Sequence, residues 1–149
     1  MKINHIALVV NDMAEGHEFW HEIMGLPAGK AYREEAQGVD VAFYPAGEDG
    51  SPIPAVELIS PLDDESGVAK YLAKKGPGMH HLCFQVDDIQ ATLDELASKG
   101  IQLIDETPRL NKKGVKVAFV HPKSTGGVLV EFYEIPEHKS TVSNTGSKN

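Results

Sequence analysis

The chain contains an internal repeat, and this repeat constrains its fold more than any other feature of the sequence. The segment INHIALVVNDM at 3–13 aligns without gaps with MHHLCFQVDDI at 79–89, so that His5 falls on His81. In both segments a strand-like apolar run is followed by an aspartate, Asp12 or Asp88, at the position of a helix N-cap. The period is too long for a solenoid repeat and indicates duplication of one supersecondary unit.

The residues after each aspartate predict a helix and then further strands. Apolar residues mark one side of each helix, which we expect to end at a glycine: Trp20, Ile23 and Met24 before Gly25, and Ile89, Leu93 and Leu96 before Gly100. Strand-like segments follow, VDVAFYPAG and PAVELIS in the first half and GVKVAFVHP and GVLVEFYE in the second.

We therefore predict an α+β fold in which two tandem βαβββ units pair into a curved mixed sheet around a shared cleft. Residues 1–61 form the first unit, 62–78 a linker helix and loop, 79–136 the second unit, and 137–149 a polar tail that we expect to be disordered.

Charge and cysteine content limit the partners. Asp and Glu number 22 against 14 Lys and Arg, a net charge of -8, which disfavours nucleic acid and anionic membrane surfaces. An anionic substrate would need a local cation or a metal ion. The single cysteine, Cys83, excludes an intramolecular disulfide and is expected to be a small buried side chain. With no apolar run long enough for a signal or a membrane span, we expect a cytoplasmic protein.

The repeat also reproduces a histidine on the first strand and a glutamate on the last strand of each half. These residues are His5 and Glu57 in the first half, and His81 and Glu131 in the second. Taken singly, a strand histidine is more often a hydrogen-bonded core residue, and a strand glutamate more often faces solvent. Because all four recur at matched positions, we predict that they bind one divalent metal ion, with nitrogen and oxygen donors that suit Zn, Fe, Co, Ni or Mn.

The adjacent His80 is assigned a structural role. Successive side chains of a strand point to opposite faces, so that His80 and His81 are not expected to share a function. In addition, the counterpart of His80 in the first half is Asn4.

Longer motifs resemble a known family. The segments PLDDESGVAKYLAKKGPGMHHLCFQVDDI and FVHPKSTGGVLVEFYE, together with QGV at 37–39, are similar to methylmalonyl-CoA epimerases of the vicinal oxygen chelate superfamily. The resemblance implies metal ligands at His5, Glu57, His81 and Glu131, and one divalent ion, Co, Ni, Mn or Zn. It also implies an acyl-CoA substrate and a homodimer.

The mechanism implied by this resemblance is proton removal alpha to a thioester, with a metal-stabilised enolate and two acid/base groups. Glu131 is the candidate for one group. Some epimerases have a glutamate where this chain has Val41; Asp40 should point to the opposite side of its strand. Glu34 and Glu35 lie in a charged loop where we expect solvated side chains.

Three further residues are candidates for substrate binding. They are Gln37 in QGV, and Lys123 and Ser124 in HPKSTGG, which would meet a carboxylate or a CoA phosphate. The alternative for the second segment is a polar turn before the last strand, which Gly126 and Gly127 also suit.

Two other functions stay open. Glyoxalase I uses two histidines and two glutamates, so the ligand set does not separate it from an epimerase. Some members of the superfamily bind ligands without catalysis, but we expect such a member to lack one or more of the four metal ligands. An extradiol dioxygenase is disfavoured, because it uses two histidines and one carboxylate and leaves positions open for oxygen.

Overall fold

The computed structural model describes residues 1–136, and the predicted tail at 137–149 lies outside the described residues. Eight strands form one sheet: β1 (Lys2–Val9), β2 (Ala31–Glu34), β3 (Val39–Pro45), β4 (Ala55–Pro61), β5 (Gly78–Gln85), β6 (Arg109–Leu110), β7 (Lys116–Val120) and β8 (Leu129–Glu134). The helical segments are α1 (Met13–His17), η1 (Glu18–Ile23), η2 (Glu35–Gln37), η3 (Glu48–Gly50), α2 (Gly67–Lys75), α3 (Ile89–Ser98) and η4 (Pro122–Ser124).

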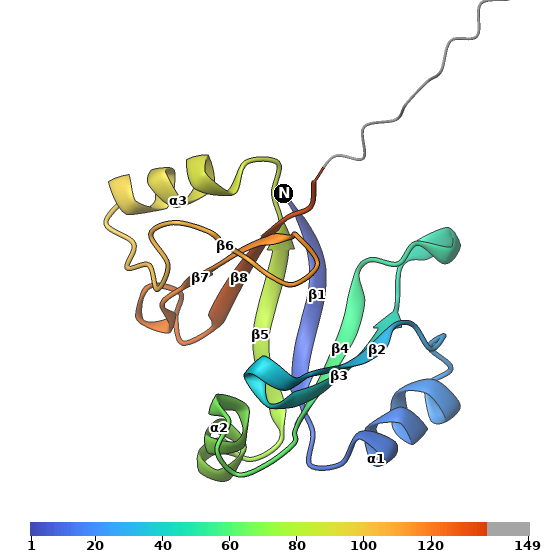
Figure 1. Cartoon of the computed structure of the whole chain (residues 1–149). Coiled ribbons are helices and arrows are strands. Elements are labelled where there is room, and N and C mark those ends of the chain that lie inside the picture. The colour runs from blue at the N-terminus through green and yellow to red at the C-terminus, as the bar shows by residue number, and fades with distance from the viewer. Residues whose placement is uncertain (137–149) are drawn as a thin grey trace, which may run out of the picture.

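The sheet confirms the predicted fold class. Its strand order is β2-β3-β4-β1-β5-β8-β7-β6, so that the two βαβββ units meet where β1 and β5 pair antiparallel. Each first strand also pairs in parallel with the last strand of its own unit, β1 with β4 and β5 with β8. Figure 1 shows these central strands side by side, with the outer strands of both units curving to the same side. The four strands expected to carry the metal ligands are therefore neighbours.

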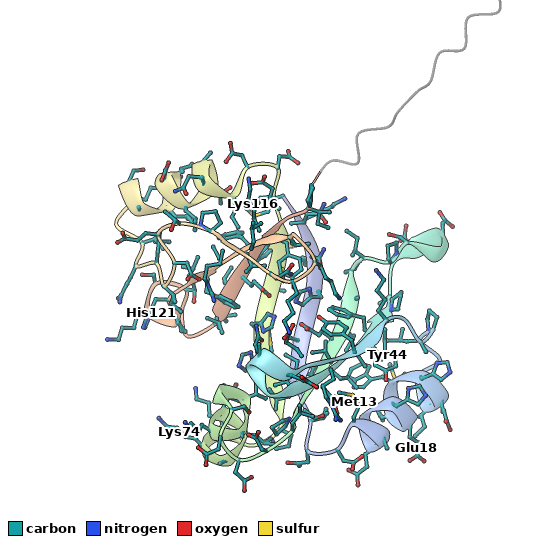
Figure 2. All side chains as sticks on the ribbon, in the orientation of Figure 1. Met13, Glu18, Tyr44, Lys74, Lys116 and His121 are labelled. Carbon is teal, nitrogen blue, oxygen red and sulfur yellow. The ribbon has the colours of Figure 1, made fainter. Side chains whose placement is uncertain are left out.

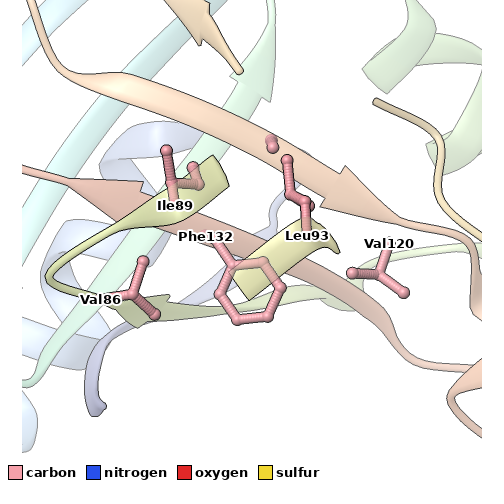
Figure 3. Packing of buried hydrophobic residues seen from close by; sticks show 6 residues of the cluster. Val86, Ile89, Leu93, Val120 and Phe132 are labelled. Carbon is pink, nitrogen blue, oxygen red and sulfur yellow. The ribbon is translucent and has the colours of Figure 1, made fainter. Parts of the chain in front are cut away.

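Alternation along the strands separates the core from the concave face of the sheet. In β8, Val130 and Phe132 pack against α3, while Glu131 and Tyr133 point to the opposite face. Figure 3 shows the α3 core, in which Ile89 and Leu93 of the helix lie over Phe132. These are the apolar residues that the helical spacing predicted for the second unit.

The first unit has a matching core under α1. Tyr44 and Leu58 are buried there, with Met13 and Trp20 packed against them, and Figure 2 shows Met13 and Tyr44 together between α1 and the sheet. The helices begin as expected, because the Asp12 and Asp88 carboxylates accept hydrogen bonds from the backbone N–H groups of Glu15 and Ala91.

The predicted apolar side of the first helix is partly wrong. Trp20 packs into the core, but Ile23 and Met24 are 68% and 55% exposed. The reason is that η1 is a π-helix, in which each turn takes in an additional residue and shifts the following side chains out of the 3.6-residue phase. Gly25 and Gly100 follow the two helices with left-handed φ angles of 79° and 78°, as expected of helix-ending glycines.

The α3 core yields a stability prediction. Leu93 is fully buried, so we expect Leu93→Ala to lower the free energy of unfolding in urea by about 2–5 kcal/mol. The matched control is Leu110→Ala, because Leu110 is 71% exposed, and here we expect a change within about 0.5 kcal/mol. Equal losses in the two variants would contradict this account of the core.

Candidate metal centre

The four predicted ligands come together on the concave face of the sheet. His5 lies on β1, Glu57 on β4, His81 on β5 and Glu131 on β8, and all four are buried. The strand pairing explains why they meet. Ala7 of β1 lies opposite both Glu57 and His81. The parallel pairing of β5 with β8 brings Glu131 next to Cys83, which is two residues after His81 and therefore on the same face of the sheet.

The ligand atoms lie close enough to surround one ion. His5 Nε2 is 3.1 Å from His81 Nε2, 2.9 Å from Glu57 Oε2 and 3.4 Å from Glu131 Oε2. His81 Nε2 is 2.8 Å from Glu131 Oε2 and 3.5 Å from Glu57 Oε2. Metal–ligand bonds of about 2.1 Å would separate neighbouring ligand atoms by about 3.0–3.4 Å in octahedral or tetrahedral coordination. The observed spacing fits a divalent metal ion.

One buried oxygen of the cluster is left without a hydrogen bond. Glu57 Oε2 lies near both imidazole nitrogens, but the angles are not those of a hydrogen bond, and no other described residue supplies a donor. A buried carboxylate oxygen without a partner is costly in a folded protein. A cation between the four side chains would satisfy it.

The cluster shifts the pKa values of its own members. Burial alone would lower the pKa of His81, but the Glu131 and Glu57 carboxylates outweigh it and raise the pKa to about 9. Burial would raise the pKa of Glu57, but His5 and His81 lower it to about 2. Without a metal ion the imidazoles thus hold protons that a metal would have to displace.

Cys83 lies under the cluster, and its sulfur is within 4.8 Å of ligand atoms of His5 and Glu131. Burial raises the pKa of this thiol, with the two glutamates adding to the effect, so the thiol stays protonated. Cys83 is fully buried, as expected from the sequence, and the donor set remains two nitrogens and two carboxylates.

A cavity of about 370 Å³ is lined by three of the four side chains, Glu57, His81 and Glu131, whereas His5 is fully buried and lies outside the lining. Its wall contains aromatic residues beside the histidines, since the rings of Tyr133 and Phe119 meet those of His5 and His81 edge to face. It also contains the basic residues Arg109, Lys112 and Lys113, so a local cation cluster faces the cleft of this acidic protein. Sequence reasoning missed these residues, because the run RLNKKG is typical of a solvated turn.

The loop between β6 and β7 contacts the opposite unit. Lys112 Nζ lies 2.8 Å from Glu34 Oε1, and Lys113 Nζ lies 3.6 Å from the centre of the Tyr32 ring. Lys112 lowers the pKa of Glu34, which is therefore ionised at neutral pH. The expectation of a solvated Glu34 is wrong, since only 18% of its side chain is exposed and it lines the cavity; Glu35 is exposed, as expected.

Of the three residues predicted to bind substrate, one lines the cavity and two lie elsewhere. Gln37 lines this cavity and also a neighbouring cavity of about 680 Å³ beside α2. Lys123 and Ser124 line neither: they form η4, where Ser124 Oγ accepts a hydrogen bond from the Gln102 N–H. This is the turn that the sequence allowed as their alternative role.

Val41 and Asp40 lie as the alternation of β3 requires. Val41 is buried and lines the cavity. Asp40 lies outside that lining and accepts hydrogen bonds from the Arg33 guanidinium at 2.8 and 3.1 Å.

His80 departs from the predicted alternation. It is half-buried, lines the same cavity as His81, and its Nδ1 lies 2.9 Å from His81 Nδ1. Burial lowers the pKa of His80 to about 4, with the neighbouring His81 adding to the effect, so its ring is neutral.

Comparison with known proteins places this geometry in a family. Residues 4–119 match the model of the Glyoxalase/Bleomycin resistance protein/Dioxygenase superfamily. The mitochondrial methylmalonyl-CoA epimerase of Homo sapiens is 37% identical over 131 residues, which cover 87% of this chain and 72% of the relative. A crystal structure of methylmalonyl-CoA epimerase from Mycobacterium tuberculosis is 32% identical and superposes with a TM-score of 0.79, over 91% of this chain and 88% of that one.

A methylmalonyl-CoA epimerase in complex with methylmalonyl-CoA and NH4+ is also similar, at 31% identity and a TM-score of 0.78 over 91% of this chain and 95% of that one. The resemblance inferred from the sequence motifs is confirmed. This chain belongs to the Glyoxalase/Bleomycin resistance protein/Dioxygenase superfamily and, within it, to the family of the methylmalonyl-CoA epimerases.

Proposed function

We propose that this protein is an epimerase that interconverts the (R) and (S) forms of methylmalonyl-CoA and depends on one divalent metal ion. The observation that carries the proposal is the cluster of two histidines and two glutamates, placed beneath a cavity with its own cations. Membership of the methylmalonyl-CoA epimerase family supports the choice of substrate.

His5, Glu57, His81 and Glu131 would hold the ion, and their nitrogen and oxygen atoms suit Co, Ni, Mn or Zn. When bound, the ion supplies positive charge where negative charge develops on the substrate. The surrounding Phe43, Phe119 and Tyr133 rings exclude water from the histidine side of the cleft.

We propose that two carboxylates, Glu131 and Glu34, move the proton. Epimerisation at C2 requires one group to take the proton from one face of the carbon and another to return a proton to the opposite face. Glu131 reaches the cavity from β8 and Glu34 from β2, so that they come from different units. Lys112 holds Glu34 in place and ionised, the form in which it accepts a proton. The reverse reaction exchanges the two roles.

We propose that basic residues of β6 and of the β6–β7 loop meet the phosphates of CoA. Arg109, Lys112 and Lys113 line the same cavity as Glu57, His81 and Glu131. The neighbouring cavity beside α2 is lined instead by the acidic residues Glu35, Asp63 and Glu65. We therefore direct the nucleotide end of the substrate toward the β6–β7 loop.

The first test is proton exchange at C2 of methylmalonyl-CoA in heavy water. We expect deuterium to enter that position, chelator to abolish the exchange, and added Co²⁺ to restore it. His81→Ala should lose metal and exchange together, whereas His121→Ala, a histidine at the periphery in Figure 2, should keep both. Absence of metal-dependent exchange in the unaltered protein rules out the proposed activity.

The same preparation separates the alternatives. Formation of a thioester from methylglyoxal and glutathione would identify glyoxalase I. A protein that retains acyl-CoA without exchanging the C2 proton would be a binding member of the superfamily.

Glu34 can be tested separately from the metal. We expect Glu34→Gln to lower kcat by about 10²–10⁴-fold with bound metal unchanged, because a general acid or base is lost. Glu35→Gln is the matched control, since its exposed carboxylate lies outside the metal cavity, and should retain the full rate. A loss of equal size in Lys112→Met would assign the effect to the ion pair and not to proton transfer.

Metal binding should release protons. In the metal-free protein the carboxylates overcome burial and raise the pKa values of both His5 and His81, the latter to about 9. At pH 7 an incoming ion must therefore displace imidazole protons, and affinity should rise as the pH approaches 9. Calorimetric titration with Co²⁺ in buffers of different ionisation enthalpy measures the release; binding heats that are independent of the buffer would contradict it.

The homodimer and the cytoplasmic location stay predictions. No helix among residues 1–136 is both long and apolar enough to cross a membrane. Light scattering of the purified protein would establish whether it forms a dimer.

A further inference from the structure

Each metal-cluster histidine is preceded by a residue that contacts its Nδ1 atom. Asn4 Oδ1 lies 2.8 Å from His5 Nδ1, and His80 Nδ1 lies 2.9 Å from His81 Nδ1. Asn4 and His80 occupy equivalent positions in the two repeats, 76 residues apart. The same contact is thus built twice, with different side chains.

Two β-bulges make these contacts possible. Between the pairs Ile3↔Phe84 and His5↔Cys83, β1 contains one residue more than β5, and that residue is Asn4. Between Ala7↔His81 and Leu8↔Met79, β5 contains the additional residue, and that residue is His80.

In a regular strand the side chains of neighbouring residues point to opposite faces and cannot meet. A bulge redirects a side chain, and bulges are frequent next to functional sites. Here each bulge turns the residue before a cluster histidine toward the ring of that histidine.

The contact fixes which nitrogen of the ring carries the proton. Asn4 Nδ2 donates to Gln85 Oε1 at 3.2 Å, which leaves Asn4 Oδ1 as the acceptor toward His5. A neutral His5 therefore has its proton on Nδ1 and an unprotonated Nε2, which lies 2.9 Å from Glu57 Oε2. Nε2 in this form cannot donate to Glu57 and is free to bind a cation.

We propose that Asn4 and His80 are positioning residues that orient the two imidazoles and direct each Nε2 toward the metal. The inference rests on the metal dependence proposed above and adds two residues to it. Side chains that hold the second nitrogen of a metal-binding histidine raise metal affinity, and their loss costs about 10–100-fold.

The two positioning residues are supported in different ways. Asn4 is buried and held by Gln85 of the neighbouring strand. His80 packs edge to face against the Tyr71 ring of α2, at 4.7 Å between ring centres, and Tyr71 Oη donates to the Met79 carbonyl at 2.8 Å. Helix α2 therefore contacts the His81 imidazole indirectly, through His80. The His5 imidazole is fully buried within the sheet and its Asn4 contact is supported by a neighbouring strand.

The test measures metal affinity without reference to turnover. Co²⁺ binding is measured by competition with a chromogenic chelator, and the visible absorption of bound Co²⁺ reports its coordination. We expect His80→Ala to bind Co²⁺ about 10–100-fold more weakly, with an altered spectrum. His80→Asn repeats the arrangement of the first half and should keep affinity within about 3-fold of the unaltered protein, a difference below 1 kcal/mol. Met79→Ala, at an exposed neighbouring position, is the matched control and should match the unaltered protein.

The first half provides an independent pair. Asn4→Asp keeps the acceptor oxygen and should bind Co²⁺ at least as tightly as the unaltered protein. Asn4→Ala removes this oxygen and should bind Co²⁺ about 10–100-fold more weakly. Thermal unfolding of the metal-free variants shows that each is folded before titration.

Full affinity in His80→Ala, or equal losses in His80→Ala and His80→Asn, would overturn the inference. Its failure differs from failure of the proposed function. Tight Co²⁺ binding without C2 exchange removes only the epimerase, normal binding in the alanine variants removes only the positioning role, and absence of Co²⁺ binding in the unaltered protein removes both.

Discussion

The burial of two carboxylates and two imidazoles at one point of the sheet is the constraint on which the rest of the structure depends. An isolated charge in such a place costs several kcal/mol, so each of these side chains is tolerable only beside the others. No single strand could supply all four, and the structure takes one from each of the four central strands. The paired units, the parallel contacts between first and last strands, and the aromatic wall all serve to bring these atoms together and keep water away.

Much of this could be predicted from the repeat. Matched positions of His5 and His81, and of Glu57 and Glu131, imply neighbouring strands once duplication is accepted, and the structure brings the four side chains together. The predictions that were wrong concern segments whose backbone departs from the regular repeat of a helix or a strand. The π-turns of η1 moved Ile23 to the surface, because helical phase is read from an assumed 3.6-residue turn.

The cavity wall was the least predictable part of the site. Glu34 and Lys112 are far apart in sequence and belong to segments rich in charge, where a solvated side chain is the ordinary outcome. Only the curvature of the sheet brings the β6–β7 loop of one unit over β2 of the other. That contact turns two charged segments into the rim of a cleft and brings lysine side chains to the cavity of a strongly acidic protein.

The paired bulges have a consequence for how such a sheet could arise. One additional residue in β1 shifts the ladder by one step, and the additional residue in β5 shifts it back, so that Ile3↔Phe84 and Leu8↔Met79 stand in the same register while the segment between them is displaced. An additional residue in only one of the two strands would shift the pairing register of all residues that follow it. Duplication of a unit that already carried the insertion would avoid this, because two copies meeting antiparallel cancel each other's offset. The register shift caused by one bulge is thus cancelled only when both copies of the unit are present in the sheet.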